Sequence, residues 1–182
     1  MPATERLLLP RGIYTPLPTF FSPDDEDVDL DAFAQHVRFV ARAGTIPVVA
    51  GSAGEAPHLS RAERTQLIST ARSALDACGL GHVPLVAGVG ASSTRETISL
   101  ACDAADAGAD FAMVIPPGYY AGQLQKEGGR ALGQFFLDVA VASPIPIVLY
   151  NFPAVSGGID LDSDLVVRVV RASDNVVGVK LT

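Results

Sequence analysis

Six short apolar runs, each separated from the next by a helix-like segment, constrain the fold of this chain more than any other feature. Continuous apolar runs of this length are typical of strands buried on both faces, which indicates a parallel sheet covered by helices. The predicted strands span residues 12–16, 45–50, 84–88, 111–115, 145–150 and 176–180. The repeated order of strand and helix therefore predicts an α/β domain.

Capping residues mark where the helices begin. Asp29 precedes a stripe of apolar residues with helical spacing. Ser60 and Glu63 have the spacing of a capping box, in which each side chain satisfies the other residue's backbone donor, and Ser93 and Glu96 repeat it. The remaining predicted helices pass through residues 132–139 and begin near Asp162.

The polar residues that stand out all follow strand ends. They are Ser52, Glu55, Tyr119, Tyr120, Tyr150, Asn151 and Lys180. An open doubly wound sheet is the alternative closure, but no Gly-x-Gly-x-x-Gly follows the first strand. A (β/α)8 TIM barrel collects strand-end residues into one site at its C-terminal face, and we therefore expect this fold.

The barrel prediction meets a difficulty of length. A barrel of this kind has eight strands in roughly 250 residues, whereas this chain has 182 residues and six predicted strands. We expect one TIM-barrel domain over residues 1–182, incomplete at its C-terminus, with residues 1–10 as a flexible N-terminal tail. A sheet that is not a closed barrel is the alternative.

Charge and composition exclude several classes of protein. The net charge of −7 argues against nucleic acid or an anionic membrane as the main partner, because both require a cationic surface. The sequence contains no stretch of about 18 apolar residues, and it therefore predicts no transmembrane helix. Residues 1–10 do not resemble a secretory signal, so we expect a cytoplasmic protein, with mitochondria as the alternative. The two cysteines and three histidines have no metal-ligand spacing.

The last apolar run ends in a lysine, Lys180. It is one of only two lysines, against eleven arginines. Arginine stays protonated in proteins, whereas a buried lysine readily loses its proton, and a neutral amine can attack a ketone to form a Schiff base. Burial in the run 176–179 is expected to favour the neutral amine. The alternative interpretation is a strand-end lysine that reaches out to solvent.

Four motifs, each placed after a predicted strand, resemble those of one enzyme family. Residues 51–55 (Gly-Ser-Ala-Gly-Glu) resemble its G-[TS]-x-G-E turn, and residues 149–153 (Leu-Tyr-Asn-Phe-Pro) resemble L-Y-N-x-P. Residues 178–180 (Gly-Val-Lys) resemble G-[IVM]-K, and residues 117–120 match its Pro-x-Tyr-Tyr loop. The family is the dihydrodipicolinate synthase and N-acetylneuraminate lyase superfamily of lysine-dependent pyruvate aldolases.

The resemblance implies catalytic roles for four residues. Lys180 would be the Schiff-base lysine, and Tyr150 would be the phenol that relays protons at the substrate. Ser52 would supply the hydroxyl of the proton relay. Tyr120 would match a tyrosine that family members often insert across a subunit interface, which implies a homodimer or homotetramer.

The same resemblance implies how a substrate carboxylate is held without a metal or organic cofactor. Ser52, Ala53 and Gly54 would offer backbone N–H groups, and glycine suits this turn because the substrate must approach closely. Ala53 stands where many members have a second threonine, so it would bind through its backbone alone. Glu55 and Asn151 are expected to hold the turns.

One departure from the family pattern bears on the substrate. Dihydrodipicolinate synthases usually carry an arginine at the position of Val155, where it holds a second carboxylate. We therefore favour a 4-hydroxy-2-oxoglutarate or 2-keto-3-deoxy-sugar-acid aldolase, a lyase that cleaves or forms a C–C bond between pyruvate and an aldehyde. The alternatives are a dihydrodipicolinate synthase-type condensation, a dehydratase or decarboxylase acting on the same imine, and an inactive remnant or non-catalytic subunit.

Overall fold

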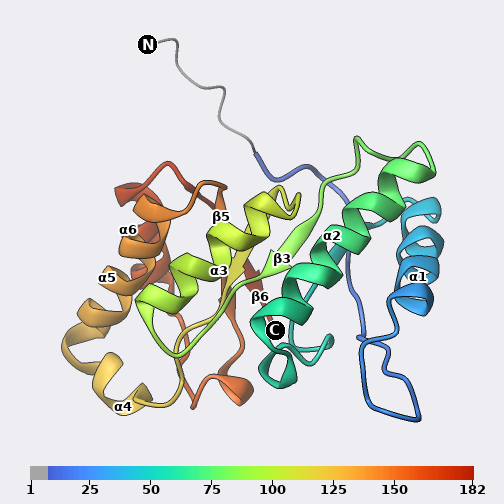
Figure 1. The fold of residues 1–182 in the computed structure, drawn as a ribbon. Helices are drawn as coiled ribbons and strands as arrows, with labels where there is room; N and C mark the ends of the chain where they lie inside the picture. The colour runs from blue at the N-terminus through green and yellow to red at the C-terminus, as the bar shows by residue number, and fades with distance from the viewer. Residues whose placement is uncertain (1–7) are drawn as a thin grey trace.

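Six parallel strands form a single sheet in the computed structural model, which describes residues 8–182 (Figure 1). The strands are β1 (Tyr14–Pro16), β2 (Ile46–Val49), β3 (Val86–Gly88), β4 (Phe111–Val114), β5 (Ile147–Asn151) and β6 (Val176–Leu181). They lie in the sheet in chain order, and each neighbouring pair is parallel. All six predicted strands are thus confirmed. Each strand lies next to the one that precedes it in the chain, which is the strand order of a (β/α)8 barrel.

Helices follow one another around the outside of the sheet, from α1 to α6 in the view of Figure 1. They are α1 (Leu30–Arg42), α2 (Arg61–Ala77), α3 (Thr94–Asp106), the short α4 (Ala121–Leu124), α5 (Lys126–Ala142) and α6 (Ser163–Ala172), with 3-10 turns η1 (Ala56–His58) and η2 (Pro153–Val155). None of the helices within residues 8–182 is long and apolar enough to cross a membrane.

The capping predictions hold with one difference. Asp29 caps α1, and Ser60 and Glu63 form the full reciprocal box at α2. At α3 the Ser93 hydroxyl accepts the Glu96 N–H at 3.2 Å, but the return bond from the Ser93 N–H to the Glu96 carboxylate is absent from the described residues. This second box is therefore only half formed.

The sheet has a core on each face. Side chains of the strands and helices form the larger core, which includes Phe33, Leu67 and Phe136. A smaller cluster lines the inner face and consists of Ile46, Val48, Val86, Phe111, Met113 and Tyr150. Strand residues alternate between the two cores, as the two-residue period of a strand requires.

The first described residues pack against the inner face. Leu9 contacts the inner cluster, and a Cβ added at Gly178 would lie 2.5 Å from its side chain, so glycine permits this close approach. Pro10 accepts a hydrogen bond from the Tyr14 hydroxyl at 2.7 Å. Residues 1–7 of the predicted tail lie outside the described residues.

The prediction that the strand leading to Lys180 is buried was wrong. Only Val176 of β6 is buried, whereas Val179 is 38% exposed and Leu181 is 66% exposed. The physical reason is topological, because β6 pairs with β5 on one edge and with no other strand among residues 8–182. Burial of a strand depends on its neighbours as well as on its own apolar residues.

Candidate active site

Three of the predicted catalytic residues converge at the C-terminal ends of the strands. The Ser52 hydroxyl lies 3.4 Å from the Tyr150 hydroxyl, although the two residues are 98 positions apart in the chain. The Lys180 Nζ lies 3.8 Å from the centre of the Tyr150 ring. The fold therefore brings an amine, a phenol and an aliphatic hydroxyl together around one aromatic ring.

The position of this ring follows from the register of the sheet. Tyr150 on β5 is directly paired with Lys180 on β6, so both side chains point to the inner face. Tyr150 is 5% exposed, and its ring is tilted against that of Phe152. Lys180 is only half-buried. The Lys180 Nζ lies over the face of the Tyr150 ring, within the distance range of lysine–aromatic contacts.

Ser52 reaches Tyr150 because the backbone turns sharply after β2. Ala50 has φ 52°, a left-handed conformation that non-glycine residues rarely adopt. This turn passes so close to β3 that a Cβ added at Gly88 would lie 2.0 Å from the Ala50 carbonyl oxygen. Glycine at position 88 is therefore required for the turn to lie where it does.

Two backbone N–H groups of this turn are left for a ligand. The N–H groups of Gly54, Glu55 and Ala56 donate to carbonyls of Gly51 or Ser52, while the Gly54 carbonyl accepts the Thr19 hydroxyl at 2.7 Å. Among residues 8–182, no acceptor is found for the N–H groups of Ser52 and Ala53. The Gly54 N–H is thus already used, and a carboxylate would be held by the other two.

The loop after β5 is held by the Asn151 side chain. Its amide donates to Asp160 at 2.7 Å and accepts the Leu161 N–H at 3.0 Å. The backbone carbonyl of Asn151 accepts a hydrogen bond from the Thr182 hydroxyl at 2.8 Å. The buried Ser156 hydroxyl donates to the Phe152 carbonyl at 2.8 Å. The structural role expected of Asn151 is therefore confirmed.

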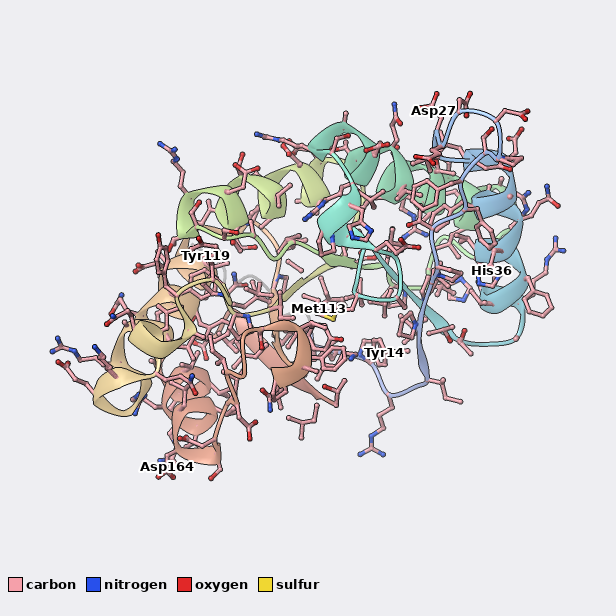
Figure 2. All side chains as sticks on the ribbon, turned by 90° about the horizontal axis from the view of Figure 1, so that it is seen from below. Tyr14, Asp27, His36, Met113, Tyr119 and Asp164 are labelled. Carbon is pink, nitrogen blue, oxygen red and sulfur yellow. The ribbon has the colours of Figure 1, made fainter. Side chains whose placement is uncertain are left out.

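A cavity of about 670 Å³ opens beside Ser52 and Tyr150. Its wall comes from the turn after β2 with η1, the loops after β3 and β4, η2, and parts of α2, α3 and β4. The wall includes Glu55, His58, Arg64, Glu96, Met113 and Val155. Sequence patterns did not single out Arg64 or Met113, and they singled out Glu96 only as a helix-capping residue, because only the fold brings these three together at the cavity. Figure 2 shows Met113 near the middle of the molecule, close to Tyr14.

Tyr119 and Tyr120 lie apart from this cavity. They are 85% and 68% exposed, and their rings form an edge-to-face pair with centres 4.9 Å apart. They line a separate groove of about 450 Å³ beside Phe135 and Asp138. In Figure 2, Tyr119 lies near the margin of the molecule. The predicted role of Tyr120 in the proton relay stays a prediction, because within this chain it does not reach Tyr150.

The two cysteines are free and half-buried. Among residues 8–182 there is no group of three or more histidine, cysteine, aspartate or glutamate side chains that could hold a metal ion.

These features define a class of protein: a parallel α/β barrel arc with a lysine, a tyrosine and a hydroxyl at its strand ends. The model of the dihydrodipicolinate synthetase family matches residues 9–182. The chain belongs to this family, as the four motifs predicted.

Several curated relatives carry aldolase names. The chain is 44% identical over 172 residues to an L-threo-3-deoxy-hexylosonate aldolase of Aspergillus niger, covering 94% of this chain and 50% of the relative. It is 44% identical over 178 residues to a protein of Emericella nidulans with the name "Probable 4-hydroxy-2-oxoglutarate aldolase, mitochondrial", covering 97% of this chain and 56% of that relative. The chain thus spans about half the length of the curated relatives it matches.

Solved structures confirm the barrel fold. A dihydrodipicolinate synthase family protein from Coccidioides immitis has a TM-score of 0.81 at 41% identity, over 93% of this chain and 51% of that protein. A prophage family member from E. coli K12, solved in complex with pyruvate, has a TM-score of 0.82 at 34% identity, over 93% and 53%. The six strands correspond to an arc of the TIM barrel of these proteins.

Proposed function

We propose that this chain carries the Schiff-base site of a lyase that cleaves or forms a C–C bond between pyruvate and an aldehyde. The observation that carries the proposal is the convergence of the Lys180 amine and the Ser52 hydroxyl on Tyr150, at 3.8 Å from its ring and 3.4 Å from its hydroxyl. This is the set that imine chemistry needs: a nucleophilic amine with a proton-transfer group beside it.

In the proposed mechanism the neutral Lys180 amine attacks the C2 ketone of a 2-oxo acid, and the Tyr150 hydroxyl donates the proton with which water leaves, giving a protonated imine and a Tyr150 phenolate. The imine withdraws electrons, so the C3–C4 bond breaks while the C4 hydroxyl passes its proton back to this phenolate. The aldehyde departs and leaves an enamine. Protonation at C3 and hydrolysis then release pyruvate and restore Lys180. Ser52 would orient the Tyr150 hydroxyl, and the Ser52 and Ala53 N–H groups would hold the carboxylate.

The names of the relatives support this reaction class and suggest a compartment. Two aldolase activities are named among them, on L-threo-3-deoxy-hexylosonate and on 4-hydroxy-2-oxoglutarate, and the E. coli family structure contains pyruvate. A cytoplasmic or mitochondrial location is proposed, and two of the relatives are named as mitochondrial.

A homodimer or homotetramer is part of the proposal. The exposed Tyr119–Tyr120 pair suits a contact with a second copy, because aromatic side chains are enriched at the cores of interfaces. Such a contact would also allow Tyr120 of one copy to approach the Tyr150 of another.

A dihydrodipicolinate synthase-type condensation is the second candidate. A 4-hydroxy-tetrahydrodipicolinate synthase of Sorangium cellulosum is 39% identical over 170 residues. Val155, which lines the cavity and is 54% exposed, argues against it, because valine cannot bind the carboxylate of a second substrate.

The test is to mix the protein with pyruvate, add borohydride and measure the intact mass, with Lys180→Arg as the matched variant. Borohydride reduces an imine to a stable adduct. We expect one pyruvate adduct on the unaltered protein and none on Lys180→Arg. A folded protein that forms no adduct would rule out the lyase. An aggregated protein without adduct would instead favour a remnant that requires a further part of a barrel.

A further inference from the structure

The turn over residues 51–55, to which the proposed function assigns the substrate carboxylate, has the hydrogen bonds of a short helical turn. The Gly54 N–H donates to the Gly51 carbonyl at 3.1 Å, across three residues. The first N–H groups of such a turn, those of Ser52 and Ala53, have no acceptor among residues 8–182, while its last carbonyl needs a donor from outside the turn. The orientation of the free N–H groups therefore depends on what holds the carbonyl end.

Thr19, in the loop after β1, holds this carbonyl end. Its hydroxyl donates to the Gly54 carbonyl at 2.7 Å, and its side chain is buried. The Gly54 backbone lies so close to the same loop that an added Cβ would be 2.9 Å from the Leu17 carbonyl oxygen. Movement of the turn away from Thr19 would leave a buried hydroxyl and a buried carbonyl without partners, which is costly.

The segment that carries Thr19 is itself fixed at both ends. Before it, the Leu17 N–H donates to the Val48 carbonyl of β2 at 3.0 Å. After it, the Phe20 carbonyl accepts a hydrogen bond at 2.8 Å from the N–H of Asp29, the residue that caps α1. Thr19 is thus attached to the sheet and to α1, and its bond to the turn fixes the turn relative to both.

A chain of hydrogen bonds leads from Thr19 to one of the free N–H groups. The Gly54 carbonyl, which accepts the Thr19 hydroxyl, belongs to the same peptide group as the Glu55 N–H. This N–H donates to the Ser52 carbonyl at 3.2 Å, and that carbonyl shares its peptide group with the Ala53 N–H. Hydrogen bonds in such a chain polarise one another, so the Thr19 hydroxyl strengthens the Ala53 N–H as a donor to an anion.

We propose that Thr19 is a positioning residue for the substrate carboxylate. Its hydroxyl fixes the 51–55 turn and begins the hydrogen-bond chain that ends at the Ala53 N–H. This inference rests on the proposed function and adds to it a residue that acts through the turn without touching the substrate. The imine chemistry stays with Lys180 and Tyr150, so loss of the Thr19 hydroxyl weakens substrate binding and leaves the chemical step in place.

The test measures the rate of imine trapping by borohydride, as intact mass at timed intervals, over a range of pyruvate concentrations. The same series is run with methyl pyruvate, an ester without the carboxylate charge. Thr19→Val keeps the shape of the side chain and removes the hydroxyl. It should raise the half-saturating pyruvate concentration about fivefold, the effect of one hydrogen bond, and change the limiting rate by less than about twofold. The preference for pyruvate over methyl pyruvate should fall by the same factor, and Thr19→Ser should preserve both values.

Thr45 provides a matched control at the opposite end of β2 from the turn. Its hydroxyl donates to the Val40 carbonyl at 3.0 Å, so Thr45→Val removes a bond of the same kind. Both valine variants should lose stability in urea. Thr45→Val should nevertheless leave the half-saturating pyruvate concentration and the preference over methyl pyruvate unchanged.

The outcomes distinguish failure of the inference from failure of the proposed function. If the unaltered protein is folded and forms no pyruvate adduct, the proposed function fails and the inference falls with it. If the adduct forms, the inference alone is overturned by unchanged pyruvate binding in Thr19→Val, by equal weakening of pyruvate and methyl pyruvate, or by equal shifts in Thr19→Val and Thr45→Val. If Thr19→Val aggregates, Thr19→Ala is measured in its place, and aggregation of both would assign Thr19 to folding and overturn the inference.

Discussion

β5 and β6 are neighbours in one sheet and carry the two side chains at the centre of the proposed chemistry, yet their surroundings differ. Every residue of β5 is buried, whereas Val176 alone is buried in β6. Tyr150 is accordingly enclosed at 5% exposure, while Lys180 is half-buried. Tyr150, the proposed proton-transfer group, is therefore held by the core, whereas Lys180, the proposed nucleophile, is held mainly by the pairing of β6 with β5.

The side-chain hydrogen bonds at the C-terminal ends of the two strands also differ. The loop after β5 is held by the Asn151 side chain, which bonds both Asp160 and the Leu161 N–H. The end of β6 is tied back to β5 by one side-chain bond, from Thr182 to the Asn151 carbonyl. β5 therefore holds the site in place, and β6 is held mainly by its hydrogen bonds to β5.

The largest expected difference is in stability. Leu149 on β5 is 1% exposed and Leu181 on β6 is 66% exposed. Leu149→Ala should lower the free energy of unfolding by about 2–5 kcal/mol, because it leaves a cavity, while Leu181→Ala should change it by less than about 0.5 kcal/mol. Urea denaturation followed by circular dichroism measures both. Similar losses in the two variants would show that β6 is as enclosed as β5 and would remove the contrast.

The next prediction concerns the division of roles between Tyr150 and Lys180. Tyr150→Phe keeps the ring under the Lys180 amine but removes the hydroxyl that lies 3.4 Å from Ser52. The rate of pyruvate imine formation should fall roughly 100-fold, the usual size of a lost general acid–base group. The rate is followed by borohydride trapping at timed intervals.

The control for this variant is its stability, since the ring packing is retained. The free energy of unfolding should change by no more than about 1.5 kcal/mol, the contribution of one hydrogen bond. An unchanged trapping rate in folded Tyr150→Phe would mean that Tyr150 only supports Lys180 sterically.

Local patterns in the sequence were enough to predict the strands and the helix starts that position the site. The Ser60–Glu63 capping box and the apolar runs of the six strands depend on residues close together in the chain, and each is present. The convergence of Ser52, Tyr150 and Lys180 also followed from the sequence, because parallel strands place their C-terminal ends at one edge.

The features that the sequence did not predict depend on contacts between distant segments. The exposure of β6 is determined by which strands pair with it, and no property of residues 176–180 contains that information. The Arg64 bonds to Ala56 and Gly90 join segments that only the folded chain brings together. The half-formed box at Ser93 has the correct residues, yet its return bond does not form.

A third prediction tests the loop after β5. Asn151→Ala removes the bonds to Asp160 and to the Leu161 N–H, and leaves that buried N–H without its partner. The free energy of unfolding should fall by about 1–3 kcal/mol, the cost of an unsatisfied buried polar group. Hydrogen exchange should accelerate most at Leu161. Retained protection at Leu161 would contradict the role assigned to Asn151.

The smallest effect is expected where β6 is tied to β5. Thr182→Val keeps the shape of the side chain but removes the hydroxyl that donates to the Asn151 carbonyl at 2.8 Å. The free energy of unfolding should fall by about 0.5–1.5 kcal/mol, and Thr182→Ser, which keeps the hydroxyl, is the matched control. Thr182→Val should also slow pyruvate trapping at Lys180. The lost bond would weaken the pairing of β6 with β5 at its C-terminal end, and this pairing positions the Lys180 amine over the Tyr150 ring. A stability loss in Thr182→Val with trapping as fast as in Thr182→Ser would mean that the pairing of Tyr150 with Lys180 holds the amine without this bond.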